Sequence, residues 1–165
     1  MASFVNPQTA SFGNMAALTS KSRNFVDWVL ARLRSAIPAA WAEQVPVYDE
    51  RELDLEQLVG QAVNSGLGAC VVASLPSFRK EGPGDPGNTL YRVSVEVAVM
   101  HNATLAPELP SAELTEGLFR AFVGAEWETA GGILCHRVGA DTLTLSATKG
   151  KLLHEFTVYC VLDMG

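Results

Sequence analysis

The sequence LYRVSVEVAVM occupies residues 90–100 and alternates apolar side chains with polar ones. An alternation of period two with one polar face is typical of a β-strand that buries only one of its sides. Arg92, Ser94 and Glu96 stand at polar positions. The segment therefore predicts a half-buried strand in the middle of the chain. Its apolar face is formed by the odd positions: Tyr91, Val93, Val95, Val97 and Val99.

The last part of the chain repeats this pattern. Glu155, Thr157 and Tyr159 lie on one side of the predicted strand, opposite an apolar side. We therefore expect the chain to end inside a sheet. The apolar side of this final strand consists of the following residues: Leu152, Phe156, Val158, Cys160 and Leu162.

Three segments have the spacing of amphipathic helices. The first covers about residues 20–36 and is ended by a proline. The second covers residues 54–66, with Asp54 as its N-terminal cap and a glycine as its stop. The third covers residues 111–124, with Ser111 as its cap and a glycine at its end. Each helix turns one apolar face toward the core.

Two further strands are expected, one between the first and second helices and one between the second helix and the central strand. Residues 44–48 form a short β-branched segment that contains Pro46, and proline favours an edge strand over a central one. Residues 69–75 are continuously apolar, as in a strand that is buried on both faces.

Residues 76–89 read PSFRKEGPGDPGNT, and their prolines and glycines predict a loop. A loop of this length exceeds what a hairpin needs, so we interpret it as a contact element. Its candidate partner contacts are Phe78, Arg79 and Lys80.

Residues 133–138, 142–147 and the final strand predict a three-strand meander with hairpin connections. The expected fold is therefore α+β, with a small mixed, mainly antiparallel sheet that is flanked by helices and ends in this meander. The prediction places one domain at residues 19–165. Residues 1–18 form an extended N-terminal arm, whose candidate partner contacts are Phe4, Val5 and Phe12.

Composition limits the classes of function. The 165 residues include 48% hydrophobic and only 18% charged residues, and mean hydropathy is +0.15. Soluble domains usually carry about 25% charged residues, so we expect a partner to cover some apolar surface. No apolar run reaches the roughly 18 residues that a membrane helix needs, and the first twenty residues do not resemble a secretory signal. We expect a protein without a membrane segment, in a reducing cytoplasm.

The net charge of −6 and the absence of a basic stripe argue against a dedicated nucleic-acid binder. Cys70, Cys135 and Cys160 lie in apolar runs and are interpreted as buried thiols. His101 and His154 have no partner at metal-ligand spacing, and the acidic run of residues 49–56 lacks the order of a calcium loop.

No pattern supplies a nucleophile with its base, a paired carboxylate site or a phosphate-binding loop. The glycine-rich run at residues 82–87 contains prolines, which lack the N–H donors that such a loop requires. Cys135 and His136 are neighbours on a strand and point to opposite faces. We expect no catalytic residues, no cofactor and no metal, and we do not expect an enzyme.

The order of elements resembles that of bacteriophage tail terminator proteins: helix, edge strand, helix, strand, long loop, strand, helix and meander. The resemblance extends to the Gp37-like proteins and to the cap proteins of contractile injection systems. It covers about residues 20–164. The stretches that carry it are residues 25–37, 69–89, 91–102, 114–124 and 143–164.

The resemblance implies a structural role without catalysis. Members of this family close into a hexameric ring on the last ring of the tail tube, stop tube growth and form the surface to which the head or neck attaches. The implied partners are other copies of the chain, the tail tube protein, and sheath and neck or head-completion proteins. DNA would pass through the channel without specific binding. The implied location is the virion tail, which is assembled in the host bacterial cytoplasm.

Three alternatives remain open. The arm of residues 1–18 is longer than the family suggests, which leaves room for a neck or tail-completion protein of the same particle. A small-ligand-binding or enzymatic α+β domain would need convergent polar groups in a pocket. A third alternative is an adaptor domain of a cellular complex.

Overall fold

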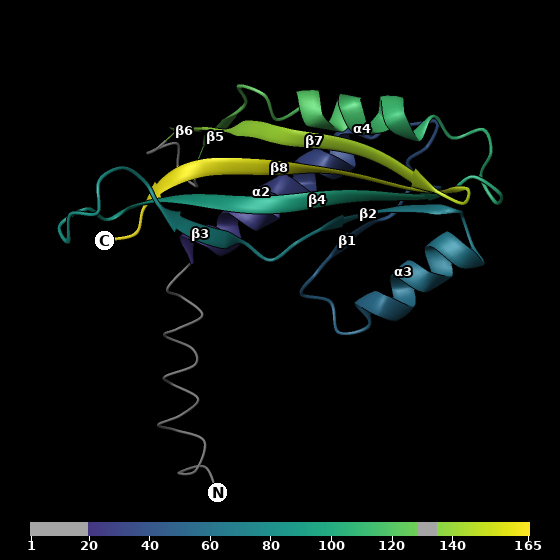
Figure 1. Cartoon of the computed structure of the whole chain (residues 1–165), viewed down its shortest axis with the longest axis horizontal. Helices are drawn as coiled ribbons and strands as arrows, with labels where there is room; N and C mark the ends of the chain where they lie inside the picture. Colours follow the sequence, from purple (N-terminus) through teal and green to yellow (C-terminus); the bar gives the residue numbers. More distant parts are fainter. Residues whose placement is uncertain (1–19, 129–134) are drawn as a thin grey trace, which may run out of the picture.

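Two long strands form the centre of the computed structural model, which describes residues 20–128 and 135–165 (Figure 1). Strand β4 (Leu90–Asn102) and strand β8 (Lys151–Asp163) pair antiparallel along their whole length. The valines at positions 93, 95, 97 and 99 are completely buried, and Glu96 is exposed. The alternation that predicted both strands is confirmed.

The sheet has six strands in the order β1-β2-β4-β8-β7, and β3 pairs with β4 beside the end of β2. β1 runs parallel to β2, and every other pair in this sheet is antiparallel. The predicted α+β class with a mixed, mainly antiparallel sheet is confirmed. The remaining strands are β1 (Val47–Asp49), β2 (Ala69–Ala73), β3 (Ser77–Lys80) and β7 (Gly139–Thr148).

Helices α2 (Lys21–Ala36) and α4 (Ser111–Arg120) pack on one face of the sheet and enclose the main core. Helix α3 (Leu55–Asn64) packs on the other face, against β1, β2 and β4. Figure 1 shows α2 behind the sheet and α3 beside its lower edge. Ser20 caps α2, because its Oγ accepts a hydrogen bond from the Arg23 N–H.

Strand β2 is buried from both sides. Ala69, Val71 and Ala73 belong to the main core, whereas Cys70 packs with Ala62 and Val63 of α3 in a second cluster. The continuous apolar run is explained by this position between two layers. The predicted edge strand is also confirmed, because β1 lies at one end of the strand order.

The predicted three-strand meander is reduced to the β7–β8 hairpin. Strand β6 (Cys135–Arg137) pairs instead with β5 (Glu126–Glu128) in a separate two-stranded ribbon. Trp127 explains this change of partner, because it is buried and packs against Phe25 at a centroid distance of 5.4 Å. The short β5 segment is therefore anchored to the main core, and β6 finds its hydrogen-bonding partner there.

The predicted loop of residues 76–89 begins as a strand. β3 pairs with β4 from Ser77 to Lys80, so the connection proper runs only from Glu81 to Thr89. The prediction failed here because prolines at both ends of a segment do not prevent the residues between them from joining an edge. The predicted arm of residues 1–18 lies outside the described residues. Within the described residues, no helix is both long enough and apolar enough to cross a membrane.

Candidate functional site

The six predicted partner contacts do not form one site. Phe78, Arg79 and Lys80 all lie on β3, but they have different surroundings. Phe78 is half exposed, and Lys80 donates a hydrogen bond of 2.9 Å to the Asp85 carbonyl within its own connection. Arg79 lines a hollow on the sheet. The other three predicted contacts, Phe4, Val5 and Phe12, lie outside the described residues.

The hollow beside Arg79 has a volume of about 400 Å³ and lies on the sheet face opposite α2 and α4. We call it the arginine hollow. Strands β3, β4, β7 and β8 all contribute to it, because the register places their polar positions side by side. Its lining residues are Ser77, Arg79, Arg92, Ser94, Asp141, Thr142 and Thr157.

Arg92 is held in place from two sides. Its guanidinium group lies 3.6 Å from the centre of the Tyr159 ring, and it forms an ion pair of 2.6 Å with Asp141. Stacking on an aromatic face together with a carboxylate contact is a geometry that arginine favours over lysine. Arg79 stands directly opposite Arg92 in the β3–β4 register. Among the described residues, no carboxylate pairs with Arg79.

A bulge shapes the far wall of the arginine hollow. The register of β7 against β8 shifts between Asp141 and Thr144, and Thr142 has φ 57°. A positive φ is unfavourable for a β-branched residue. Bulges change the direction of side chains, and this one lies where Asp141 meets Arg92. The strained backbone is thus part of how the hollow is built.

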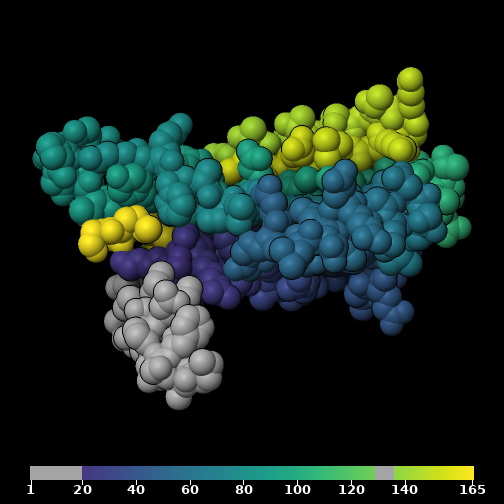
Figure 2. Space-filling view, turned by 90° about the horizontal axis from the view of Figure 1, so that it is seen from below, coloured from purple at the N-terminus to yellow at the C-terminus, as the bar shows by residue number. Residues whose placement is uncertain are grey.

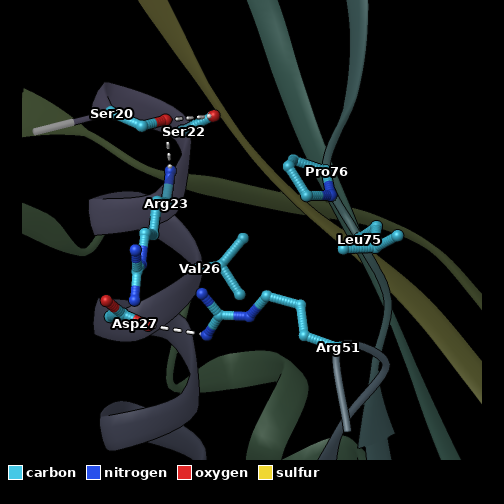
Figure 3. A pocket seen from close by; sticks show the side chains of 8 residues that line it. All are labelled: Ser20, Ser22, Arg23, Val26, Asp27, Arg51, Leu75 and Pro76. Carbon is cyan, nitrogen blue, oxygen red and sulfur yellow. Dashed lines mark hydrogen bonds and ion pairs between the residues drawn. The ribbon is translucent and has the colours of Figure 1, made fainter. Parts of the chain in front are cut away.

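A second hollow, of about 490 Å³, lies between the start of α2 and the connection from β2 to β3 (Figure 3). Arg51 crosses it and pairs with Asp27 at 2.7 Å and with Asp49 at 2.5 Å. Burial acts to raise the pKa of Asp49, but hydrogen bonds from Arg51 and its charge hold that pKa below the usual value. The arginine joins α2 to the segment after β1. Val26, Leu75 and Pro76 supply apolar walls.

A buried polar cluster joins both long strands to α4. We call His101, Ser111 and His154 the His-Ser-His cluster, and each of the three is at most 5% exposed. His101 Nε2 lies 2.6 Å from the Ala106 carbonyl, which can only accept. A neutral His101 therefore accepts the Ser111 hydroxyl proton at Nδ1, over 2.9 Å.

The direction of the remaining hydrogen bonds follows from this assignment. The Ser111 oxygen accepts from His154 Nε2 at 3.3 Å, and His154 Nδ1 accepts from the Ser146 N–H at 3.3 Å. The predicted cap role of Ser111 was wrong. Pro110 occupies the cap position, and Ser111 is the first helical residue, with its hydroxyl turned to the histidines. With the Ala106 carbonyl and the Ser146 N–H, the cluster satisfies its buried polar groups and holds the start of α4 against the sheet.

The thiols of Cys70 and Cys160 are buried, as their apolar surroundings predicted. Burial raises the pKa of Cys70 to about 11 and that of Cys160 to about 12, so both stay protonated near neutral pH. The side chain of Cys135 lies outside what the structure describes. In the described part of the chain, no three His, Cys, Asp or Glu side chains are grouped to hold a metal ion.

The arginine hollow contains residues that sequence reasoning did not single out. Arg92, Asp141 and Tyr159 come from three strands, and only Arg79 was among the predicted contacts. The only sequence feature that pointed to Arg92 was its polar position in the alternation of residues 90–100. No protein-family model matches the chain, and its sequence matches no curated protein.

Proposed function

We propose that this chain is a structural protein of a phage tail or a phage-like tail. In this role it caps the tail tube as a ring of six copies, stops tube growth and forms the surface to which the head or neck attaches. The order of its elements, which resembles that of tail terminator proteins, supports the proposal. The surface of the single subunit supports it as well.

The observation that carries the proposal is an open sheet. α2 and α4 cover one face along β4 and β8, whereas α3 covers the other face only over β1, β2 and the end of β4 around Met100. Figure 1 shows β4 and β8 uncovered in front of α2. Leu153 and Val161 are exposed on this uncovered face of β8. A sheet face of mixed polarity suits an interface between proteins.

The edge of the sheet is open too. Among the described strands, β7 ends the strand order, and its residues are exposed from Thr144 onward. A long edge strand presents unpaired backbone groups that another chain can pair with. Further large apolar side chains are exposed on the single subunit: Leu53, Leu67, Leu75, Phe78, Leu90, Leu105, Val123, Leu145 and Met164.

The charge of the chain fits the same role. A net charge of −6 per copy gives an assembled ring a strongly acidic character. DNA slides through a channel with acidic walls without adhering to it, because phosphates are repelled. The proposed ring therefore lets DNA pass and binds none specifically.

Mass measurement tests the proposal. We expect native mass spectrometry and light scattering to report six times the subunit mass of 17.6 kDa, either for the protein alone or after addition of the tail tube protein encoded near it. Electron microscopy should then show the ring at tube ends, and its addition should stop tube elongation.

A monodisperse monomer that also fails to bind tube ends would overturn the proposal. A ring that binds head-completion protein but leaves tube elongation unchanged would also overturn it, in favour of a neck or tail-completion protein. A ring at tube ends that halts elongation supports it.

A further inference from the structure

We propose that the arginine hollow receives the carboxylates of Asp54 and Glu56 from a second copy of the chain. This contact would join neighbouring subunits head to tail, and the proposal rests on the ring assembly proposed above. Ion pairs between arginine and carboxylate side chains would hold the two patches together.

The arginine hollow holds two positive charges and one negative charge. Arg79 and Arg92 lie directly opposite each other on β3 and β4, and like charges at paired positions destabilise a sheet. Asp141 compensates only Arg92, at 2.6 Å. One positive charge of the hollow therefore stays without a partner in a chain whose net charge is −6. A carboxylate from outside relieves the repulsion between the two arginines.

The arginine hollow is already organised in the single subunit. Arg92 is fixed between the Tyr159 ring and Asp141, so little side-chain freedom is lost when it binds an anion. Thr142 has φ 57° at the bulge that forms one wall. Backbone strain of this kind persists where the surroundings impose it and is frequent at binding sites. Hydroxyl groups of Ser77, Ser94 and Thr157 supply further donors along the walls.

Asp54 and Glu56 are the acidic pair that we propose for the hollow. Asp54 stands at the N-cap of α3, yet its carboxylate makes no capping hydrogen bond. Within the described chain, neither Asp54 nor Glu56 has an ion-pair partner. Leu53 beside them is completely exposed. Two carboxylates with an exposed apolar neighbour match two guanidinium groups in a hollow, because carboxylate and guanidinium bind in paired hydrogen bonds.

The two patches belong to different parts of the molecule. The carboxylates follow β1, whereas the hollow lies on β3, β4, β7 and β8. Figure 2 shows α3 (blue) across the middle of one face and the end of β3 with its connection (teal) projecting at one end. A contact between two different patches is heterologous, so each copy offers both halves. Such contacts form a ring when the rotation from one copy to the next closes, as the proposed ring of six requires.

Charge reversal tests the contact. In the variant Arg79→Glu both patches are acidic, and in the double variant Asp54→Lys with Glu56→Lys both are basic. We expect each variant alone to lower the assembled fraction more than about tenfold, because unpaired charges in an interface cost more than one factor of ten. An equimolar mixture should assemble again, because each patch then meets its opposite. Six is even, so the two variants alternate around a closed ring.

Matched controls separate this effect from unfolding and from net charge. Lys149→Glu and the double variant Glu108→Lys with Glu116→Lys make the same changes of charge at exposed positions outside both patches, and we expect normal assembly. Arg79→Glu removes the repulsion of Arg92, so its monomer should melt at or above the wild-type temperature. Added salt should weaken wild-type assembly, because exposed charges are screened.

The outcomes distinguish this proposal from the proposed function. If wild-type rings form and both reversed variants form them equally well, the contact is wrong and the ring stands. If the reversed variants fail and their mixture fails too, the patches do not meet each other, and the contact is overturned. If the wild-type protein forms no ring with or without tube protein, the proposed function fails and this contact with it. Rescue in the mixture alone supports the contact.

Discussion

The side chain of His154 is only 2% exposed, and its hydrogen-bond partners fit the neutral imidazole. Its Nε2 donates to Ser111 and its Nδ1 accepts from the Ser146 N–H, so a second proton would remove one of these hydrogen bonds. Burial, and after it the charge of His101, lowers the pKa of His154. Protonation at Nδ1 therefore removes the hydrogen bond from the Ser146 N–H, which joins β7 to β8.

The pH dependence of folding follows from this lowered pKa. Above the ordinary histidine value of about 6.5 both states are neutral, and the stabilisation is complete. As the pH falls below that value, the unfolded chain takes up the proton first, so acidification favours unfolding. We expect urea denaturation to give a lower free energy of unfolding at about pH 5.5 than at about pH 7.5.

The variant His154→Gln should show a smaller difference between the two pH values. His136→Gln is the matched control, because burial and Lys21 lower the pKa of His136 as well, but its side chain is only partly buried. We expect the control to retain most of the difference. An equal difference in the wild type and in His154→Gln would contradict the assignment of this effect to His154.

The connection from β3 to β4 has internal structure at the scale of the element. The Glu81 N–H donates to the Leu90 carbonyl at 3.0 Å, which continues the ladder by one pair. Asn88 Nδ2 donates to the Glu81 and Pro83 carbonyls, and Lys80 donates to Asp85. These hydrogen bonds hold residues 81–89 in a defined shape beside the exposed Phe78. The connection can therefore serve as a contact element without the support of a helix.

Replacing residues 82–89 by Asn-Gly tests this function of the connection. Shortening a loop changes closure entropy by only a few tenths to about 1 kcal/mol, so the fold should persist. The loss of Thr89, which accepts from the Met164 N–H at 2.8 Å, should loosen only the end of the chain. We expect circular dichroism to show a folded protein whose melting point falls by a few degrees, while ring assembly on tubes is lost.

A second variant isolates the cause of that loss. Eight glycine and serine residues in place of residues 82–89 keep the length and remove the side chains. If both variants cap tubes as well as the wild type, the connection has no contact function. If only the glycine-serine variant assembles, length alone matters and the side chains do not.

At the scale of the whole molecule, the described residues form two core clusters. The main cluster joins α2 and α4 to the sheet, and the second cluster joins α3 to β2. Phe25, Phe122 and Phe156 are the largest of the completely buried side chains. Burial on both faces of β2 ties the two clusters together through one strand.

We predict that deletion of residues 1–18 leaves the melting temperature of the subunit within a few degrees of the wild type. The reason is that the apolar residues of this segment are too sparse and too irregularly spaced for a core-packed helix. The sequence of this segment, with its isolated apolar residues, predicts binding to a neighbouring protein instead. Hydrogen exchange of residues 1–18 should be fast in the free subunit and slow in the assembled particle. Slow exchange in the free subunit would assign the segment to the fold of the domain itself.

Local patterns were sufficient to predict most elements of this fold. The period of two in residues 90–100 identifies β4 because a strand alternates its side chains strictly. The start of α2 at Ser20 and its end before Pro38 follow from backbone hydrogen bonding within a few residues. The burial of β2 follows from its unbroken apolar run. These features depend on neighbours in sequence, so one sequence reveals them.

Pairing between distant segments was decided only by the tertiary structure. Arg79 meets Arg92 because β3 takes a particular register on β4, and Asp141 reaches Arg92 because a bulge redirects it. The Ser111 hydroxyl forms hydrogen bonds with His101 and His154 instead of capping a helix, because α4 starts directly beside β4 and β8. β6 does not join the expected meander but pairs with β5, which the buried Trp127 anchors to the main core. Register and packing join residues from 10 to 49 positions apart, and the energies of these contacts depend on the completed core rather than on any local pattern.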